Sequence, residues 1–271
     1  METKKERYFI EISFKGTNYH GWQVQNNAIS IQEVLDRALS IVFRERVSTI
    51  GCGRTDAGVH AKQLFAHFDL MVKASSDDEI GLKEGLNDAS DHRDNHKIKQ
   101  YLRGINALLP SDIAAKALFK VKPDAHARFD AISRVYEYHI HFGKNPFLTD
   151  FSWQIRDELH VDKMNQAAAI MMEYTDFSCF SKSNTQVFTN NCEITFAEWK
   201  KLEEGKLVFE IHANRFLRNM VRAIVGTLIE IGKGNQKVNF IREVLESKNR
   251  SLAGVSVPAC GLYLTKVIYP N

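Results

Sequence analysis

The stretch Cys192-Glu-Ile-Thr-Phe-Ala-Glu-Trp199, followed across Glu204-Gly205 by Lys206-Leu-Val-Phe-Glu-Ile-His-Ala213, does most to decide the fold. Each half is rich in β-branched and aromatic residues, and the Glu-Gly pair between them is a turn signal. Together they predict an antiparallel pair of strands. Further strands and helices are predicted along the chain without a regular βαβ repeat, which favours an α+β fold with a largely antiparallel sheet.

Hydrophobic periodicity predicts the other elements. Strands are predicted over residues 8–14, 47–50, 64–68, 134–142 and 262–269. Helices are predicted over residues 31–42, 160–173, 215–231 and 239–248. Ser30-Ile-Gln-Glu33 has the form of a capping box at the start of the first helix. Asp162 is predicted to cap the start of the second helix.

The composition is that of an ordinary globular protein. The chain has 271 residues, of which 44% are hydrophobic and 25% charged, and its formal net charge is +3. These values exclude a disordered chain and a highly charged nucleic-acid tail. They do not exclude a nucleic-acid enzyme, because net charge averages over surfaces of different sign.

Targeting and cysteine signals point to the cytoplasm. No segment approaches the roughly 18 to 20 apolar residues of a membrane span, and the N-terminus lacks the apolar region of a signal peptide. The four cysteines are widely spaced and include no C-x-x-C pair. We therefore expect a cytoplasmic protein with no membrane segment, no disulfide framework and no metal site.

A polar segment over residues 75–100 interrupts the first half of the chain. It holds seven acidic residues against four Lys or Arg, a net charge of −3, so the other 245 residues carry +6. We interpret it as an exposed insertion, in which His92 and His96 are solvated and do not bind a metal. A domain boundary is predicted just after it, giving an N-terminal domain over 1–112 and a C-terminal domain over 113–271.

The loop Gly51-Cys-Gly-Arg-Thr-Asp-Ala-Gly-Val-His60 is the most unusual stretch. Its three glycines allow a positive φ or a close backbone approach, and Arg54 and Asp56 between them suit a site for a polar ligand. A turn with a local Arg54–Asp56 pair is an alternative interpretation of equal weight. The loop matches neither the phosphate-binding G-x-x-x-x-G-K-[ST] pattern nor the G-x-S-x-G nucleophile pattern.

Two further stretches could bind RNA. On a helix over 215–231, Arg215, Arg218 and Arg222 would share one narrow stripe opposite an apolar face. Such a stripe is usually solvated, but three neighbouring cations repel one another and favour a polyanionic or carboxylate partner. Tyr136 and Tyr138 share one face of a predicted strand and could stack on bases, although tyrosines in this pattern more often belong to the core.

Together these stretches resemble the tRNA pseudouridine synthase A family. Gly53-Arg-Thr-Asp-Ala-Gly-Val-His-Ala61 is similar to the catalytic loop of that family. His126-Ala-Arg-Phe129 with Arg134-x-Tyr136-x-Tyr138, and Asn214-Arg-Phe-Leu-Arg-Asn-Met-Val-Arg222-x-Ile-Val-Gly226, resemble its second and third motifs. Supporting matches, in family order over nearly the whole chain, are Tyr19-His-Gly-Trp-Gln23, Ile105-Asn-Ala-Leu-Leu-Pro110, Asp176-Phe-Ser178 and Gly261-Leu-Tyr-Leu264.

The resemblance implies a pseudouridine synthase fold and activity. The fold would comprise two similar α/β subdomains, with mainly antiparallel sheets joined into one extended sheet and an active-site cleft between them. The activity would be the isomerisation of uridine to pseudouridine at positions 38, 39 and/or 40 in the anticodon stem-loop of tRNA. Members of the family are homodimers that use neither an organic cofactor nor a metal in the chemistry.

The resemblance also implies roles for individual residues. Asp56 matches the catalytic aspartate, Tyr136 the tyrosine that stacks on the target base, and Arg222 the basic residue that pairs with the aspartate. Leu262 lies in the segment that supplies apolar packing near the uracil. The remaining predicted substrate contacts are Arg54, Thr55, His60, Tyr138, Arg215 and Arg218.

The chemistry agrees with these residue types. The reaction breaks the N1–C1′ bond, turns the uracil and joins C5 to C1′, so it needs a flipped base but no redox group. An aspartate can assist as nucleophile or as base, and a nearby cation such as Arg222 would keep it ionised and oriented. The sequence leaves open whether Asp56 attacks the sugar carbon, attacks the ring or transfers a proton.

Two departures from the family pattern and two competing hypotheses remain. The insertion over 75–100 is longer than in the bacterial pattern, and Thr189-Asn-Asn-Cys192 stands where the family often has an arginine. An RNA-binding module without catalysis is disfavoured because Asp56, Tyr136 and Arg222 are all present. An unrelated α+β scaffold or metal protein is the other hypothesis, and metal analysis with tRNA co-purification would separate it.

Overall fold

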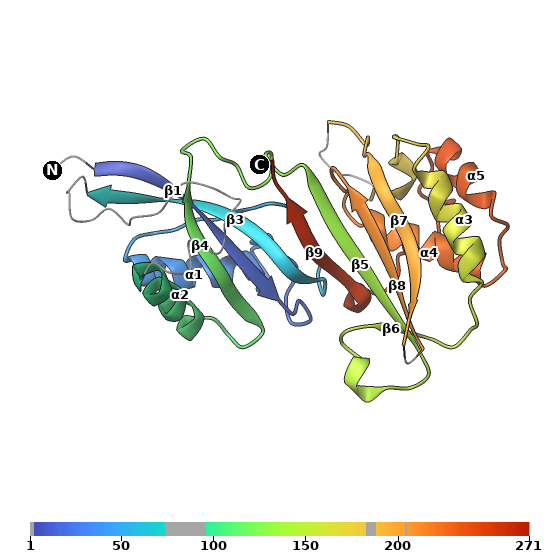
Figure 1. The fold of residues 1–271 in the computed structure, drawn as a ribbon, viewed down its shortest axis with the longest axis horizontal. Coiled ribbons are helices and arrows are strands. Elements are labelled where there is room, and N and C mark those ends of the chain that lie inside the picture. Colours follow the sequence, from blue (N-terminus) through green and yellow to red (C-terminus); the bar gives the residue numbers. More distant parts are fainter. Residues whose placement is uncertain (1–2, 74–95, 183–187, 204, 271) are drawn as a thin grey trace. The chain divides into compact units, whose positions relative to one another are not determined.

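The chain divides into two compact units, whose elements are labelled in Figure 1. The first comprises residues 1–132 and 266–271, and the second comprises residues 133–265. The computed structural model describes residues 3–73, 96–182, 188–203 and 205–270.

The first unit is built on a central strand. β1 (Thr3–Phe14) pairs antiparallel with both β3 (His60–Lys73) and β4 (Ile113–Val121), and β2 (Ile50–Gly51) pairs with β3. Side chains on both faces of β1 are buried at its centre, including consecutive residues over 8–10. The predicted strand is therefore confirmed, but its burial is two-sided because elements cover both faces of the sheet.

Two helices accompany this sheet. α1 (Ile31–Phe43) begins at Ser30, whose hydroxyl accepts a hydrogen bond from the Glu33 backbone N–H, which confirms the predicted cap. α2 (His96–Leu108) buries Ile98. The last residues of the predicted polar insertion, 96–100, form the first turns of α2, and of these five only Ile98 is buried. His92 lies outside the described residues.

The predicted strand over 47–50 is wrong apart from Ile50. The Val47 N–H donates to the Ser40 hydroxyl at 2.9 Å, and the Thr49 N–H donates to the Asp36 carboxylate at 3.0 Å. Side chains of α1 thus satisfy backbone groups that would otherwise need a strand partner.

The second unit contains the predicted hairpin. β8 (Lys206–Ala213) pairs antiparallel with β7 (Ile194–Leu202) and with β5 (Ser133–Phe142). The short β6 (Trp153–Ile155) runs parallel to β5, and β9 (Leu262–Ile268) neighbours β5 on its other side. The predicted α+β class with mainly antiparallel strands is confirmed.

The helices of the second unit cover one face of its sheet (Figure 1). They are α3 (Val161–Met171), α4 (Met220–Gly232) and α5 (Phe240–Ser247). The second unit also contains three short 3-10 turns, η2 (Pro146–Leu148) before α3, η3 (Ser178–Phe180) after it and η4 (Ala259–Gly261) before β9. The residue before α3 is His160, so the predicted cap at Asp162 is wrong; Asp162 lies in the first turn. An acidic residue there still complements the positive end of the helix dipole.

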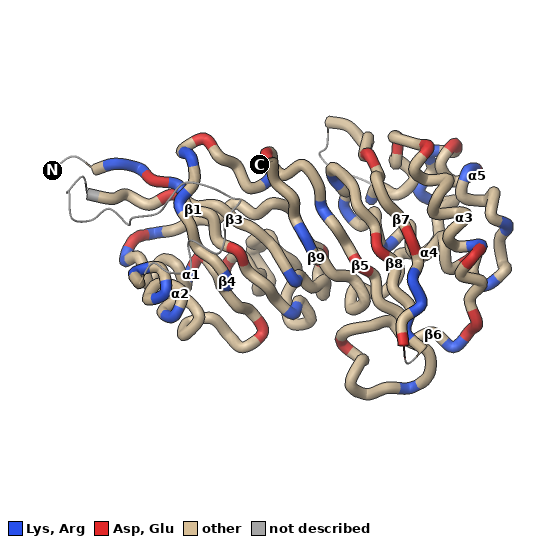
Figure 2. Tube along the Cα trace, in the orientation of Figure 1, with Lys and Arg blue, Asp and Glu red and all other residues tan. Residues whose placement is uncertain are grey.

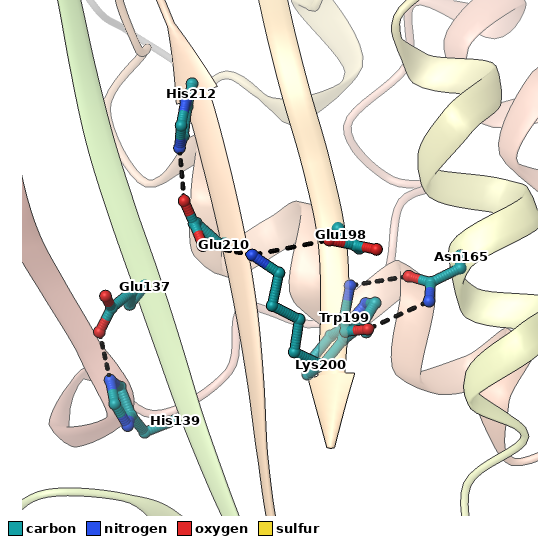
Figure 3. A network of polar contacts seen from close by, with 8 residues as sticks. All are labelled: Glu137, His139, Asn165, Glu198, Trp199, Lys200, Glu210 and His212. Atoms are coloured by element: carbon teal, nitrogen blue, oxygen red, sulfur yellow. Dashed lines mark hydrogen bonds and ion pairs between the residues drawn. The ribbon is translucent and has the colours of Figure 1, made fainter. Parts of the chain in front are cut away.

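The other face of this sheet is polar, as Figure 3 shows. Glu210 and His212 alternate along β8 with buried apolar residues and hydrogen-bond each other at 2.7 Å. Lys200 on β7 donates to Glu210 at 2.9 Å. At the edge, Asn165 of α3 accepts from the Trp199 N–H at 2.7 Å and donates to its carbonyl at 3.1 Å, which protects edge strand β7 from pairing with another chain.

The boundary between the units falls later than the predicted division between residues 112 and 113. β4 pairs with β1 over its whole length, from Ile113 opposite Phe14 to Val121 opposite Arg7, so it belongs to the first unit. The chain returns there at its end, where Ile268 accepts a hydrogen bond from the Ile132 N–H at 2.8 Å. Figure 2 shows charged residues of both signs on each unit.

Candidate active-site loop and its supports

The loop with Asp56 connects β2 to β3 and is fixed at both ends. The Cys52 N–H donates to the Phe65 carbonyl at 2.8 Å, and the Val59 N–H turns back to the Asp56 carbonyl at 3.2 Å. Gly58, with φ of +77°, supplies the left-handed backbone of this turn. Asp56 is half-buried near the tip of the loop.

A second segment, residues 16–22, holds the loop from the side. The Trp22 N–H donates to the Thr55 carbonyl at 3.3 Å, and the Gly58 N–H donates to the Tyr19 carbonyl at 3.2 Å. The backbones approach so closely that a Cβ added at Gly21 would lie 2.2 Å from the Thr55 carbonyl oxygen. Glycine is therefore required there on steric grounds, and Asp56 sits between backbone contacts on both sides.

The supporting segment is itself anchored. Tyr19 donates its hydroxyl to Asp112 at 2.6 Å, and burial together with this carboxylate raises the pKa of Tyr19. The Gly21 carbonyl accepts from the Ile31 N–H at 3.1 Å, at the first turn of α1. The N–H groups at the start of α1, which have no partner within the helix, thus hold residues 16–22, and these residues in turn hold the Asp56 loop.

A buried glutamine completes this support. Gln32 donates to the Thr49 carbonyl at 2.7 Å and accepts from the Val24 N–H at 3.0 Å and from Gln23 at 2.9 Å. Sequence reasoning assigned Gln32 no role. The available signal was a polar residue between the buried positions Ile31 and Leu35 of an amphipathic helix.

The residues predicted from the loop differ in exposure. Arg54 is exposed. Thr55 is only 9% exposed, and its hydroxyl oxygen has no hydrogen-bond partner among the residues that the structure describes. His60 is buried, and its Nδ1 accepts the Gly16 N–H at 3.0 Å. This contact gives His60 a structural role, and its predicted substrate contact stays a prediction.

The two tyrosines of β5 separate into different environments. Tyr136 is half-buried and meets the Phe216 ring edge-on at a centroid distance of 5.0 Å. Tyr138 is fully buried and donates to the Pro258 carbonyl at 2.8 Å, and burial raises its pKa. The core interpretation therefore fits Tyr138 better than a base contact does. Leu262 is also buried, at the start of β9.

The predicted arginine stripe is wrong. α4 begins at Met220, so Arg215 and Arg218 precede the helix, and only Arg222 lies on it. Asn219 takes a left-handed φ of +66°, which a continuous helix does not permit. The three arginines consequently do not share a helical face.

Arg222 is tied to the segment before η4. Its Nε donates to the Val257 carbonyl at 2.7 Å, and the Val257 N–H donates back to the Arg222 carbonyl at 3.3 Å. One turn further on, a Cβ at Gly226 would lie 1.9 Å from the Val255 carbonyl oxygen, so this segment lies directly on the helix backbone. The Nε bond to Val257 is one contact that orients the Arg222 side chain.

The segment that lacks the family arginine is closed by other groups. The Cys192 N–H donates to the Thr175 carbonyl at 2.9 Å, and the Phe177 N–H donates to the Asn190 carbonyl at 3.2 Å. Asn190 also donates its side-chain N–H to the Ser178 hydroxyl at 3.0 Å.

Within the described ranges, no three or more His, Cys, Asp or Glu side chains gather as metal ligands, and no helix is long and apolar enough to cross a membrane.

Comparison with known proteins places these features in a family. Residues 174–270 match the family model described as tRNA pseudouridine synthase. A tRNA pseudouridine synthase A of Bacteroides fragilis is 46% identical over 266 residues, which cover 98% of this chain and 97% of that protein. The protein of the same name from Bacteroides thetaiotaomicron is 45% identical over 98% of this chain and 91% of its own. The one from Thermoanaerobacter pseudethanolicus is 35% identical over 96% of this chain and 98% of its own.

The α+β fold and the similarity over nearly the whole chain are those of a pseudouridine synthase. Within that class, the chain belongs to the tRNA pseudouridine synthase A family. The predicted pairing of Asp56 with Arg222 joins residues of different units and stays a prediction.

Proposed function

We propose that the protein isomerises uridine to pseudouridine in tRNA, at positions 38, 39 and/or 40 of the anticodon stem-loop. The single observation that carries this proposal is the backbone support of the Asp56 loop by residues 16–22, within a chain of this family. A reacting carboxylate has to be held within a fraction of an ångström, and two sets of backbone hydrogen bonds do so without help from solvent-exposed side chains.

Asp56 is the proposed catalytic group. The glycosidic bond breaks between N1 and C1′, the uracil turns, and a bond forms between C5 and C1′, after which C5 loses its proton and N1 gains one. A base must be lifted from its stack before a carboxylate can reach it. Asp56 then acts as nucleophile or as base at the nucleotide. The isomerisation needs no external oxidant or reductant, so we propose no cofactor.

Tyr136 and Arg222 are the proposed partners of Asp56. Tyr136 offers a flat ring to the uracil and a hydroxyl that can relay a proton, and Phe216 fixes the ring from its edge. Arg222 is oriented by Val257 and is proposed to hold the Asp56 carboxylate. Leu262 is proposed to supply apolar packing near the uracil.

Arg54, Arg215 and Arg218 are proposed to contact RNA phosphates. Such contacts supply most of the affinity for RNA and weaken with salt. Arg54 lies in the loop before β3, and Arg215 and Arg218 precede α4 instead of lying on it, so each should act separately. We further propose that the protein acts as a homodimer in the cytoplasm.

Tritium release tests the chemistry. tRNA labelled with tritium at uracil C5 is incubated with the wild type, with Asp56→Ala and with Asp162→Ala, an exposed aspartate of α3. Release by the wild type and Asp162→Ala, and none by Asp56→Ala, is expected. Equal release by all three, or none from a competent tRNA, contradicts the proposal.

Substitutions at Tyr136 and Arg218 test the partners and the RNA contacts. Tyr136→Phe should retain binding of the uracil ring and Tyr136→Ala should not, so their rates separate stacking from proton relay. Arg218→Ala should reduce the slope of log affinity against log salt by about 1. Arg37→Ala, at an exposed position of α1, is the matched control. An unchanged salt slope for Arg218→Ala contradicts its assignment to a phosphate.

A further inference from the structure

A short segment between β4 and β5, residues 125–130, is held unusually firmly. The His126 N–H donates to the Asp130 carboxylate at 2.7 Å, and the Asp130 N–H donates back to the His126 carbonyl at 3.1 Å. The His126 ring Nδ1 also accepts the N–H groups of Arg128 and Phe129, at 3.1 and 3.3 Å. The segment therefore forms one compact turn closed by its own polar groups.

Residues of three other elements of the first unit anchor this turn. Tyr269 donates to the Ala127 carbonyl at 2.6 Å, and the Ala127 N–H donates to the ring Nδ1 of buried His67 at 3.1 Å. Arg7 of β1 donates to the Ala125 carbonyl at 3.0 Å. Burial lowers the pKa of His67 to about 4, so this ring is a neutral acceptor at physiological pH. The backbone of the turn is accordingly rigid.

This rigid turn presents an aromatic ring to solvent. Phe129 is 74% exposed, although the core of the first unit begins two residues earlier with fully buried Ala127. The His126 ring lies against Phe129 at a centroid distance of 4.2 Å, and the Arg128 guanidinium lies 5.6 Å from the Phe129 centroid. An exposed large apolar residue on a rigid support, with a cation beside it, is characteristic of a binding surface.

We propose that Phe129, with Arg128, is a stacking platform for an unpaired nucleobase of the RNA substrate. The proposal rests on the proposed function, because it takes tRNA to be the ligand. Unstacked bases in RNA loops are bound on aromatic rings and guanidinium planes, and this works for any base because each has a π-face. The cation selects a polyanion over an uncharged apolar partner. The turn is anchored to His67 within β3, whereas the Asp56 loop precedes the start of β3 at His60, so the platform is taken to bind a nucleotide other than the one that reacts.

Fluorescence tests the stacking directly. Phe129→Trp places an indole on the platform, and a stacked base quenches indole emission. The matched control is Phe147→Trp, since Phe147 is 85% exposed on η2, in a turn capped by Asn145. Unmodified tRNA and single-stranded oligouridylate are added separately to full-length protein, and the wild-type signal is subtracted. Quenching of Phe129→Trp alone by both RNAs is expected. No quenching, equal quenching of both variants, or a change caused by protein concentration without RNA overturns the proposal.

Binding measurements give a second test that does not depend on emission. Phe129→Ala should weaken tRNA affinity about tenfold, the effect typical of one lost base stack, without changing the salt slope. Phe147→Ala should not weaken it. Thermal unfolding checks that both variants fold, as expected for exposed side chains. Full affinity of Phe129→Ala overturns the proposal. Tritium release by the wild type is measured beside it, so a failure of the platform is distinguishable from a failure of the proposed function.

Discussion

Replacing Gly21 by alanine should slow catalysis by moving the Asp56 loop. Gly21 has a φ of +84°, and a Cβ there would lie 2.2 Å from the Thr55 carbonyl oxygen. Real Cβ atoms almost never approach another atom within 3.0 Å, so the two backbones must separate by at least 0.8 Å. Thr55 immediately precedes Asp56, so the carboxylate moves with it. A misplacement of about 1 Å can slow a reaction about 100-fold.

The control for this prediction isolates backbone strain from the steric clash. Gly234 has a φ of +78°, and a Cβ there meets nothing within 4 Å. Both substitutions force alanine into a left-handed conformation, at a cost of about 1 to 2 kcal/mol. Only Gly21→Ala adds the clash, which brings a further cost of about 1 to 3 kcal/mol.

Tritium release and thermal unfolding are then measured on both variants. Gly234→Ala should keep the wild-type rate despite its lower unfolding temperature. Gly21→Ala should lose roughly 100-fold in rate at a temperature where it is fully folded. A near wild-type rate for folded Gly21→Ala would refute the reasoning that this close backbone contact positions Asp56.

Three other predictions concern stability. Thr55→Val should leave the free energy of unfolding unchanged or raise it by about 1 kcal/mol, because it removes a buried hydroxyl that lacks a partner; a clear loss in urea denaturation contradicts this, and Thr55→Ser is the control. The pKa of His67 is lowered from 6.5 to about 4, so the folded state prefers the neutral ring. Its contribution to the free energy of unfolding is therefore complete above pH 6.5. This contribution decreases as the pH falls to 4, by about 3 kcal/mol in all. Urea titrations across this range should show that decrease in the wild type and a flatter profile in His67→Gln. Burial raises the pKa of Asp36 from 3.8 to about 6, so stability is lost as the pH rises through that interval. Asp36→Asn can still accept hydrogen bonds from Thr49 and should be more stable than the wild type at pH 7 by about 1 to 2 kcal/mol. Equal or lower stability of Asp36→Asn would contradict this prediction.

The hydrophobic periodicity of the sequence predicted those elements whose conformation is decided by which of their side chains are buried. The hairpin of β7 and β8, the strand β5 and the capped helix α1 were all predictable, because each shows an apolar pattern with clear end signals. The start of α4 was not predictable. A helical wheel assumes a continuous helix over residues 215–231. The apolar pattern runs through Asn219 on both sides, but Asn219 itself leaves the helical conformation.

The candidate site shows a similar division. Asp56, Tyr136 and Arg222 became candidates because they match the motifs of the family, and their roles stay predictions. The residues that hold Asp56 do so mostly through backbone groups, as at Gly21 and Trp22. Because any residue type can form backbone hydrogen bonds, only the glycine could be noticed in the sequence. The sequence likewise gave no sign that the ring of buried His60 accepts the backbone N–H of Gly16.

The return of residues 266–271 to the first unit has a consequence for the order in which the protein matures. During synthesis, residues 1–132 emerge from the ribosome long before Tyr269 is added to the chain. The hydroxyl of Tyr269 donates a hydrogen bond to the Ala127 carbonyl. The unit made first is therefore completed last, after the whole of the second unit has emerged. Removal of the final six residues should consequently damage the half of the protein that carries Asp56, at the opposite end of the chain.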